Sequence, residues 1–194
     1  MNRRELLRCA GAAAFLAPVG LLGRPRRAFA LGGTLPELEA PAPAFQLGGV
    51  KPEAGRAIEA SLSLADFAGQ WLVLYFYPKD FTGGCTIEAR GFQNDLASFQ
   101  AANAAVVGVS ADDPDSHASF CSEEGLAFPL LSDPGGNVSQ RYGSWLPPFS
   151  QRHTFLIDPQ GVLRARWVAV RPSGHSTEVL AELKRQQGQQ RLVT

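Results

Sequence analysis

The sequence contains few of the residues that bind metals or form disulfide networks. Its 194 residues include three cysteines and three histidines, and no two cysteines are arranged as C-x-x-C. The usual motif for disulfide exchange and the paired-cysteine motifs for zinc are therefore excluded. Cys9 lies close to the N-terminus, so the rest of the chain can form one disulfide at most, between Cys85 and Cys121. His117 and Cys121 could share a helix face, but two ligands make a weak metal site, and we expect no metal or other cofactor.

The sequence also lacks an excess of charge of either sign. Its 18 basic side chains (Lys and Arg) balance 18 acidic ones. Six arginines and a single acidic residue, Glu5, lie in the first 30 positions, which leaves 12 basic and 17 acidic residues in the remainder. A mildly acidic domain without a basic stripe has no electrostatic basis for binding nucleic acid or anionic lipid. We therefore expect neither nucleic acid nor a membrane as a partner of the mature domain.

The apolar stretch near the N-terminus is too short for an ordinary membrane-spanning helix. It runs from Cys9 to Gly23 and has roughly 14 apolar residues, interrupted by Pro18, whereas a spanning helix needs ~20. Paired arginines at positions 3 and 4 precede it, and the small-x-small sequence 28–30 follows it. This pattern predicts a twin-arginine-type export signal over residues 1–30, cleaved after Ala30, that delivers the domain to a periplasm or a thylakoid lumen. An uncleaved membrane anchor is the alternative.

Strand and helix patterns alternate along the rest of the chain. Residues 71–77 form a continuous apolar and aromatic run that ends at Pro78, which is typical of a strand buried on both faces. Residues 86–102 have apolar positions at helical spacing, and residues 105–110 form a second buried strand, which completes a βαβ unit. The further expected elements are a helix from about 114 to 124, a short helix at 138–142, strands at 152–157 and 162–168, and a terminal helix at 176–187.

This order of elements predicts an α/β protein with a thioredoxin-like fold, in which helices flank both faces of a central mixed β-sheet. Residues 31–52 are rich in Pro, Gly and Ala, and we interpret them as a linker and an N-terminal edge segment. Residues 53–190 are then expected to form a single catalytic domain.

Cys85 lies where a buried strand ends, a glycine-containing loop turns and a helix begins. Backbone N–H groups and the positive end of the helix dipole meet at such a position, and both stabilise a thiolate. The thiolate is the nucleophilic form of cysteine, so the position predicts a reactive sulfur. A buried structural cysteine is the alternative, but a helix start directly after Gly83 and Gly84 is a poor place for a core residue.

The sequence around this cysteine resembles that of a known family. Pro78, Thr82 and Cys85 match the P-x-x-x-T-x-x-C signature of peroxiredoxins. Three further blocks follow in the order shown by the peroxiredoxin Q, or bacterioferritin comigratory protein, subfamily: residues 108–112, 128–133 and 152–158. The resemblance covers about residues 61–183. It implies a thiol-specific peroxidase that reduces hydrogen peroxide and organic hydroperoxides without a cofactor.

The resemblance also implies a role for each matched residue. Cys85 is expected to attack the peroxide and become a sulfenic acid, the reversible first oxidation state of cysteine. Pro78 is expected to shield the sulfur, the Thr82 hydroxyl to hydrogen-bond the peroxide, and Arg152 to hold the thiolate and the peroxide oxygens. Thr82 could instead be only a turn residue, and Arg152 only a surface cation. Gly83 stands where many relatives carry proline, so the loop is expected to be less rigid.

Cys121 is the candidate for the second step of the reaction. Many members of the subfamily carry a resolving cysteine five residues after the first, where this chain has Arg90, and another branch carries it in the next helix, as Cys121 does. The resemblance therefore implies a monomer with an intramolecular Cys85–Cys121 disulfide that a thioredoxin-like donor reduces. Because a disulfide needs Cα atoms within about 7 Å, we expect the first turn after Cys85 to unwind, either alone or together with the turn around Cys121.

Two alternatives to this scheme remain open. Cys121 could be incidental, which would leave a one-cysteine enzyme resolved by an external thiol. The chain could also be a non-catalytic exported module of thioredoxin-like fold with one structural disulfide.

Overall fold

The computed structural model describes residues 28–191. Most of the expected export signal, residues 1–27, lies outside this part of the chain. Its last residues fall within β1 (Phe29–Ala30), which pairs with β2 (Gly33–Thr34). The backbone N–H of Trp145, the first residue of β8 (Trp145–Leu146), donates to the carbonyl of Gly32 in this hairpin at 3.1 Å. From residue 28 to residue 191, no helix is long and apolar enough to cross a membrane.

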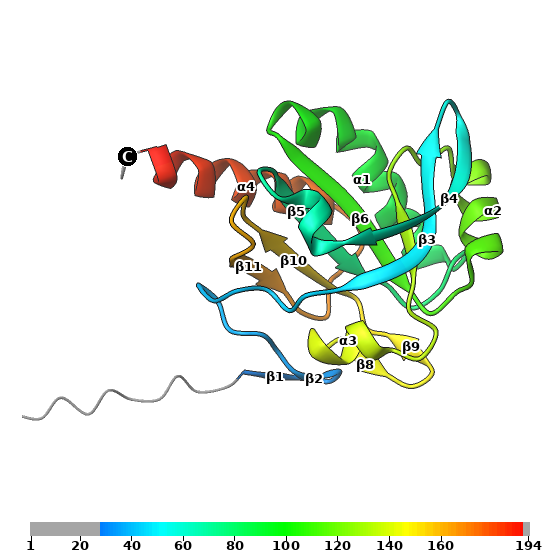
Figure 1. Cartoon of the computed structure of the whole chain (residues 1–194), viewed down its shortest axis with the longest axis horizontal. Helices are drawn as coiled ribbons and strands as arrows, with labels where there is room; N and C mark the ends of the chain where they lie inside the picture. The colour runs from blue at the N-terminus through cyan, green and yellow to red at the C-terminus, as the bar shows by residue number, and fades with distance from the viewer. Residues whose placement is uncertain (1–27, 192–194) are drawn as a thin grey trace, which may run out of the picture.

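The centre of the structure is a seven-stranded sheet with the order β11-β10-β5-β6-β7-β3-β4 (Figure 1). Its strands are β3 (Gln46–Glu53), β4 (Arg56–Ser63), β5 (Trp71–Phe76), β6 (Ala104–Ser110), β7 (Leu130–Ser132), β10 (His153–Ile157) and β11 (Leu163–Trp167). β5, β6 and β7 pair in parallel, and the outer strands on both sides pair antiparallel. All six residues of β5 are buried, because this strand lies at the middle of the sheet with both faces covered.

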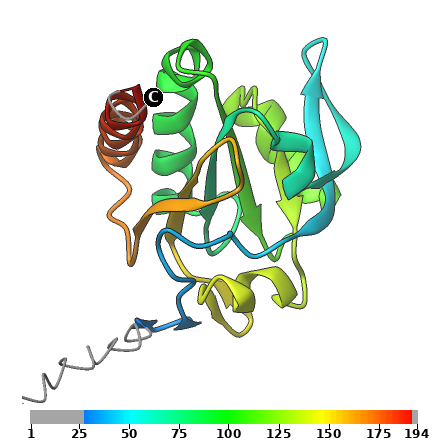
Figure 2. The same ribbon diagram turned by 60° about the vertical axis from the view of Figure 1, so that its left-hand side comes forward.

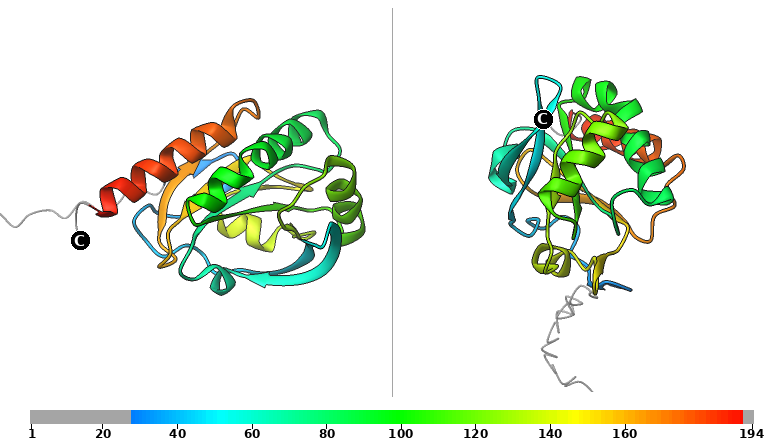
Figure 3. Two further views of the ribbon diagram at one scale, coloured as in Figure 1. Left: turned by 90° about the horizontal axis from the view of Figure 1, so that it is seen from above. Right: turned by 90° about the vertical axis from the view of Figure 1, so that its right-hand side faces the viewer.

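Helices cover the two faces of the sheet unequally (Figure 2). One face carries the three long helices, α1 (Gly83–Ala101), α2 (Pro114–Glu124) and α4 (His175–Arg191). The other face carries α3 (Asn137–Arg141), the 3-10 helix η1 (Leu64–Phe67) and the segment that precedes β3. Figure 3 shows α1 and α4 lying side by side over the sheet. A short hairpin of β8 and β9 (Phe149–Ser150) completes the fold.

The alternation of side chains along the strands fills both layers. In β5, Val73 and Tyr75 pack under the long helices, whereas Leu72 and Leu74 pack under the opposite layer. A strand that is buried on both faces has a continuous apolar sequence, and β5 has such a sequence. The predicted thioredoxin-like α/β fold is thus confirmed.

The edge of the sheet differs from the sequence prediction. Residues 46–53 form β3, which pairs along its whole length with β4 and on its other side with β7, whereas the sequence prediction placed residues up to 52 in a linker and edge segment. The outermost strand is β4, and the expected domain boundary between residues 52 and 53 falls inside β3. The strand pattern is weak because β3 contains Gly48, Gly49 and Pro52, and β4, as an edge strand, has few large apolar residues.

Two smaller differences affect the position of the candidate site residues. α1 begins at Gly83 instead of residue 86, so Cys85 lies inside its first turn. β10 begins at His153, so Arg152 precedes the strand and is not part of it. α2 agrees with the prediction, since the Asp113 side chain caps its N-terminus and Gly125 ends it in the left-handed conformation.

The close approach of β3 and β7 predicts a difference between two neighbouring glycines. A Cβ at Gly49 would lie 2.2 Å from the carbonyl oxygen of Leu130, whereas a Cβ at Gly48 meets nothing within 4 Å. We expect Gly49→Ala to lower the free energy of unfolding by about 1–3 kcal/mol, because a backbone atom must shift. Gly48→Ala, the matched control, should change it by less than about 0.5 kcal/mol. Urea denaturation of both variants checks this, and equal midpoints would contradict the strand pairing.

Candidate active site

Cys85 is held at the end of the central strand by the first turn of α1. After β5 the chain passes Pro78, which is half-buried, and reaches Thr82 at the N-cap of the helix. Cys85 is the third residue of α1, and only 1% of its surface is exposed. It belongs to the apolar cluster under the long helices, yet its sulfur faces polar partners.

Two side chains donate hydrogen bonds at the Cys85 sulfur. The Thr82 hydroxyl lies 2.8 Å from Sγ and 2.9 Å from the carbonyl oxygen of Lys79. The Arg152 Nη2 atom lies 3.2 Å from Sγ. The hydroxyl has one proton for two acceptors, so it can turn from the carbonyl to the sulfur. The structure therefore brings Arg152, which lies 67 residues from Cys85 in the sequence, together with Thr82 and Cys85.

A glycine makes room for the guanidinium. A Cβ at Gly84 would lie 3.1 Å from Nη2 of Arg152 and 3.5 Å from Cγ of Pro172. The missing side chain allows the cation to approach the helix start closely. Gly83, by contrast, has nothing within 4 Å of an added Cβ.

Glu88 is a part of the site that sequence reasoning missed. Its Oε2 atom accepts a hydrogen bond from Arg152 Nη1 at 2.5 Å, and its side chain has no exposed surface. Glu88 lies three residues after Cys85, one helical turn away on the same face, and that spacing is the only local signal. Arg152 thus bridges a buried carboxylate and the sulfur.

Burial and charge shift the pKa values of this pair in identifiable ways. Burial raises the pKa of Glu88 to about 7, although Arg152 beside it opposes the rise. Burial disfavours the charged form of Arg152, but Glu88 and Cys85 outweigh it, and the pKa of Arg152 is raised. The guanidinium therefore stays charged next to the sulfur.

Cys121 lies on α2 in the same apolar cluster as Cys85. Burial raises the pKa of its thiol to about 12, with a further contribution from the Asp80 carboxylate. Both cysteines are free, so the structure shows the reduced state. In residues 28–191, no group of three or more His, Cys, Asp and Glu side chains could hold a metal ion.

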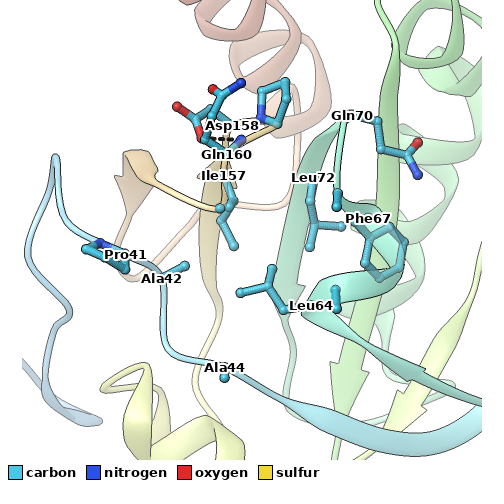
Figure 4. Close-up of a pocket in the computed structure, with 14 residues that line it drawn as sticks. Pro41, Ala42, Ala44, Leu64, Phe67, Gln70, Leu72, Ile157, Asp158 and Gln160 are labelled. Carbon is cyan, nitrogen blue, oxygen red and sulfur yellow. Dashed lines mark hydrogen bonds between the residues drawn. The ribbon is translucent and has the colours of Figure 1, made fainter.

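An apolar pocket of about 380 Å³ lies at the other end of the sheet (Figure 4). Leu64, Phe67, Leu72 and Ile157 line it, and Pro41 and Ala42 close one side. Leu72 is near the start of β5, whereas Cys85 follows the end of that strand. The pocket is therefore separate from the reactive sulfur.

Comparison with known proteins agrees with the geometry of the site. The chain matches the AhpC/TSA family over residues 38–166. Peroxiredoxin Bcp of Xanthomonas campestris is 41% identical over 131 residues, which cover 63% of this chain and 81% of that protein. The chloroplastic peroxiredoxin Q of Populus jackii is 38% identical over 128 residues, which cover 64% of this chain and 60% of that one.

A solved structure shows the same similarity in three dimensions. Peroxiredoxin Q of Xanthomonas campestris superposes with a TM-score of 0.66 at 36% identity, over 73% of this chain and 90% of that one. The predicted family resemblance is thereby confirmed. The chain belongs to the AhpC/TSA family and is a peroxiredoxin, a thiol peroxidase of the Bcp and peroxiredoxin Q type.

Proposed function

We propose that Cys85 is the peroxidatic cysteine of this enzyme. The observation that carries the proposal is the pair of donors at its sulfur, the Thr82 hydroxyl at 2.8 Å and the Arg152 guanidinium at 3.2 Å. The thiolate sulfur attacks one peroxide oxygen, an S–O bond forms and the O–O bond breaks. The departing oxygen takes a proton and leaves as water or an alcohol, and Cys85 becomes a sulfenic acid.

The fixed donors supply the catalysis. Negative charge moves from the sulfur to the departing oxygen, and donors that are already in place stabilise it without reorganisation. The Thr82 side chain makes no capping hydrogen bond, so it does not occupy the free N–H groups of the first turn of α1. Pro78, at the end of β5, is proposed to keep water from the sulfur. Glu88 is proposed to fix the orientation of Arg152, because it binds the other nitrogen of the guanidinium.

The proposed substrates are hydrogen peroxide and organic hydroperoxides. Phe81 precedes Thr82 and is 48% exposed, so it offers apolar surface on the loop that leads to the reactive sulfur. A structural study of the Xanthomonas campestris bacterioferritin comigratory protein concerns its alkyl peroxide reduction activity. Both observations support an alkyl-bearing substrate for this chain.

We propose further that Cys121 resolves the sulfenic acid as an intramolecular disulfide. Two solved structures of Xanthomonas campestris peroxiredoxin Q carry serine in place of one cysteine each, at positions 36 residues apart, which is also the separation of Cys85 and Cys121. With a pKa of about 12, the buried Cys121 thiol is protonated and a poor nucleophile in the folded form. Part of α2 must therefore open before the disulfide forms.

The remaining proposals concern partners and location. The disulfide is reduced by exchange with a thioredoxin-like donor, and the intramolecular disulfide suits a monomer. The paired arginines and the small residues before position 31 support export to a periplasm or a thylakoid lumen.

Removal of the Thr82 hydroxyl tests the donor set at the sulfur. We expect Thr82→Val to lower the second-order rate constant with hydrogen peroxide by about 10²–10³-fold, because a donor to the developing charge is lost. Thr82→Ser keeps the hydroxyl and should stay within about tenfold of the wild type. Stopped-flow measurement of the first turnover gives both values. Equal rates for the Val and Ser variants would exclude a role for the hydroxyl, and an undiminished rate in Cys85→Ser would exclude the peroxidatic cysteine itself.

The raised pKa of Glu88 predicts a pH-dependent difference in stability. Between the ordinary value of 4.5 and the folded value of about 7, the native state binds more protons than the unfolded chain, so stability falls as pH rises. Relative to Glu88→Gln, the wild type should lose about 2–3 kcal/mol of unfolding free energy between pH 4.5 and 8. Urea denaturation of the reduced proteins at several pH values measures this. Curves that run parallel would show that Glu88 titrates normally.

The Cys121→Ser variant separates the ways of resolving the sulfenic acid. We expect a first turnover with peroxide within about threefold of the wild type, no internal disulfide, and loss of turnover with thioredoxin as the reductant. Peptide mapping of the oxidised proteins and a coupled turnover assay check the three points. Full turnover of the variant with thioredoxin would instead indicate a one-cysteine enzyme.

A further inference from the structure

A buried carboxylate links the loop before Cys85 to the helix that carries Cys121. Asp80 is 3% exposed, and its Oδ1 atom accepts a hydrogen bond from the Tyr77 hydroxyl at 2.7 Å. Its Oδ2 atom accepts from the Ser116 hydroxyl at 2.8 Å and lies 2.9 Å from Nδ1 of His117. Its backbone N–H donates to Oδ2 of Asp112 at 2.9 Å. We call Asp80, Ser116 and His117 the α2 latch.

The latch connects the loop that leads to Cys85 with the helix that carries Cys121, and these are the cysteines of the two proposed reaction steps. Asp80 lies two residues before Thr82, in the loop that leads to the reactive sulfur. Ser116 and His117 lie in the first turns of α2, and Cys121 follows His117 one helical turn later. His117 has no exposed surface, and Phe120 on the same helix packs against Phe81 of the loop, with ring centroids 5.1 Å apart.

The hydrogen bonds of the latch attach α2 to the loop before Cys85, and they are stronger than the polar contacts at the other end of the helix. A buried carboxylate needs compensating donors, and hydrogen bonds to a charged group are about twice as strong as neutral ones. The other end of α2 is joined to α1 by the Arg90–Glu124 ion pair, whose Arg side chain is 63% exposed, and by the Ala127 N–H donating to Gln93. An exposed ion pair contributes little to stability. Among the polar contacts that hold α2, those at the Asp80 end are therefore the strong ones.

We propose that Asp80 is a positioning residue, and that release of the α2 latch limits the rate at which Cys121 attacks the oxidised Cys85. The inference rests on the proposed resolution by Cys121. In that step the Cys121 sulfur attacks the sulfur of the sulfenic acid, an S–S bond forms and the S–O bond breaks. The hydroxyl leaves with the thiol proton as water.

The latch also sets how sensitive the enzyme is to excess peroxide. While α2 stays closed, the sulfenic acid of Cys85 remains open to a second peroxide molecule, which oxidises it to sulfinic acid. A tight latch therefore favours overoxidation, and a loose latch favours the disulfide. The attack of Cys85 on the first peroxide does not require the latch to open.

The Asp80→Asn variant tests the proposal, because it replaces charge-assisted hydrogen bonds by neutral ones at constant size. We expect the disulfide to form about tenfold faster, and half-overoxidation to need about tenfold more peroxide. Rapid acid quench with thiol labelling and mass spectrometry gives both quantities. In a Cys121→Ser background, the first turnover with peroxide should change by less than about threefold. Asp115→Asn, which removes an exposed carboxylate from the same helix turn, is the matched control and should match the wild type.

The outcomes distinguish this proposal from the one on which it rests. If wild-type protein forms no Cys85–Cys121 disulfide, the resolution by Cys121 fails. If the disulfide forms, but at an unchanged or lower rate in Asp80→Asn, the latch is overturned while resolution stands. If Asp80→Asn does not fold, the Ser116→Ala variant decides. It removes one hydrogen-bond donor to Asp80 and leaves the buried carboxylate in place. It should accelerate the disulfide by about threefold, and no acceleration overturns the latch.

Discussion

The contact between the Arg152 guanidinium and the Cys85 sulfur is the interaction on which the site depends. A buried cation is costly unless it is paired, and here Glu88 lies on one side of it and the sulfur on the other. The same pairing keeps Glu88 from being an isolated buried carboxylate. Gly84 has no side chain that would separate these groups. The cation and the carboxylate, which would each be costly to bury alone, are therefore stable together beside the Cys85 sulfur.

The topology of the sheet explains why residues so far apart in the chain meet. β10 runs antiparallel to β5, and His153 pairs with Phe76, so the start of β10 lies beside the end of β5. Arg152 immediately precedes β10, while the loop to Cys85 immediately follows β5. A mixed sheet brings both segments to one edge. The strand β6 runs parallel to β5, so the end of β6, at Ser110, lies next to the end of β5. The helix α2 follows β6, and its residue Cys121 lies on the same side of the sheet as Cys85.

The sequence is informative where the signal is local. The run at 71–77, the caps of α2 and the spacing of Pro78, Thr82 and Cys85 need only neighbouring residues. The β3–β4 hairpin was not predicted, because its glycines serve close backbone contact and its edge strand buries little. Glu88 and Asp80 were missed for another reason. Both are buried charged residues with partners far away in the sequence, 64 positions for Glu88 and 36 and 37 positions for Asp80, and no local pattern predicts such partners.

The proposed mechanism places opposite demands on the two cysteines, and the structure holds each of them in a different way. Cys85 lies in a first turn that begins with Gly83 and Gly84, residues that add little to helix stability, and its buried sulfur is held by the donors Thr82 and Arg152. Cys121 lies on a helix that is capped at both ends and joined to a buried carboxylate. Both cysteines are therefore held in the closed form, Cys85 through its sulfur and Cys121 through its helix. In the proposed mechanism, the closed form suits attack on peroxide, and the strength with which α2 is held determines how long the sulfenic acid of Cys85 waits for Cys121.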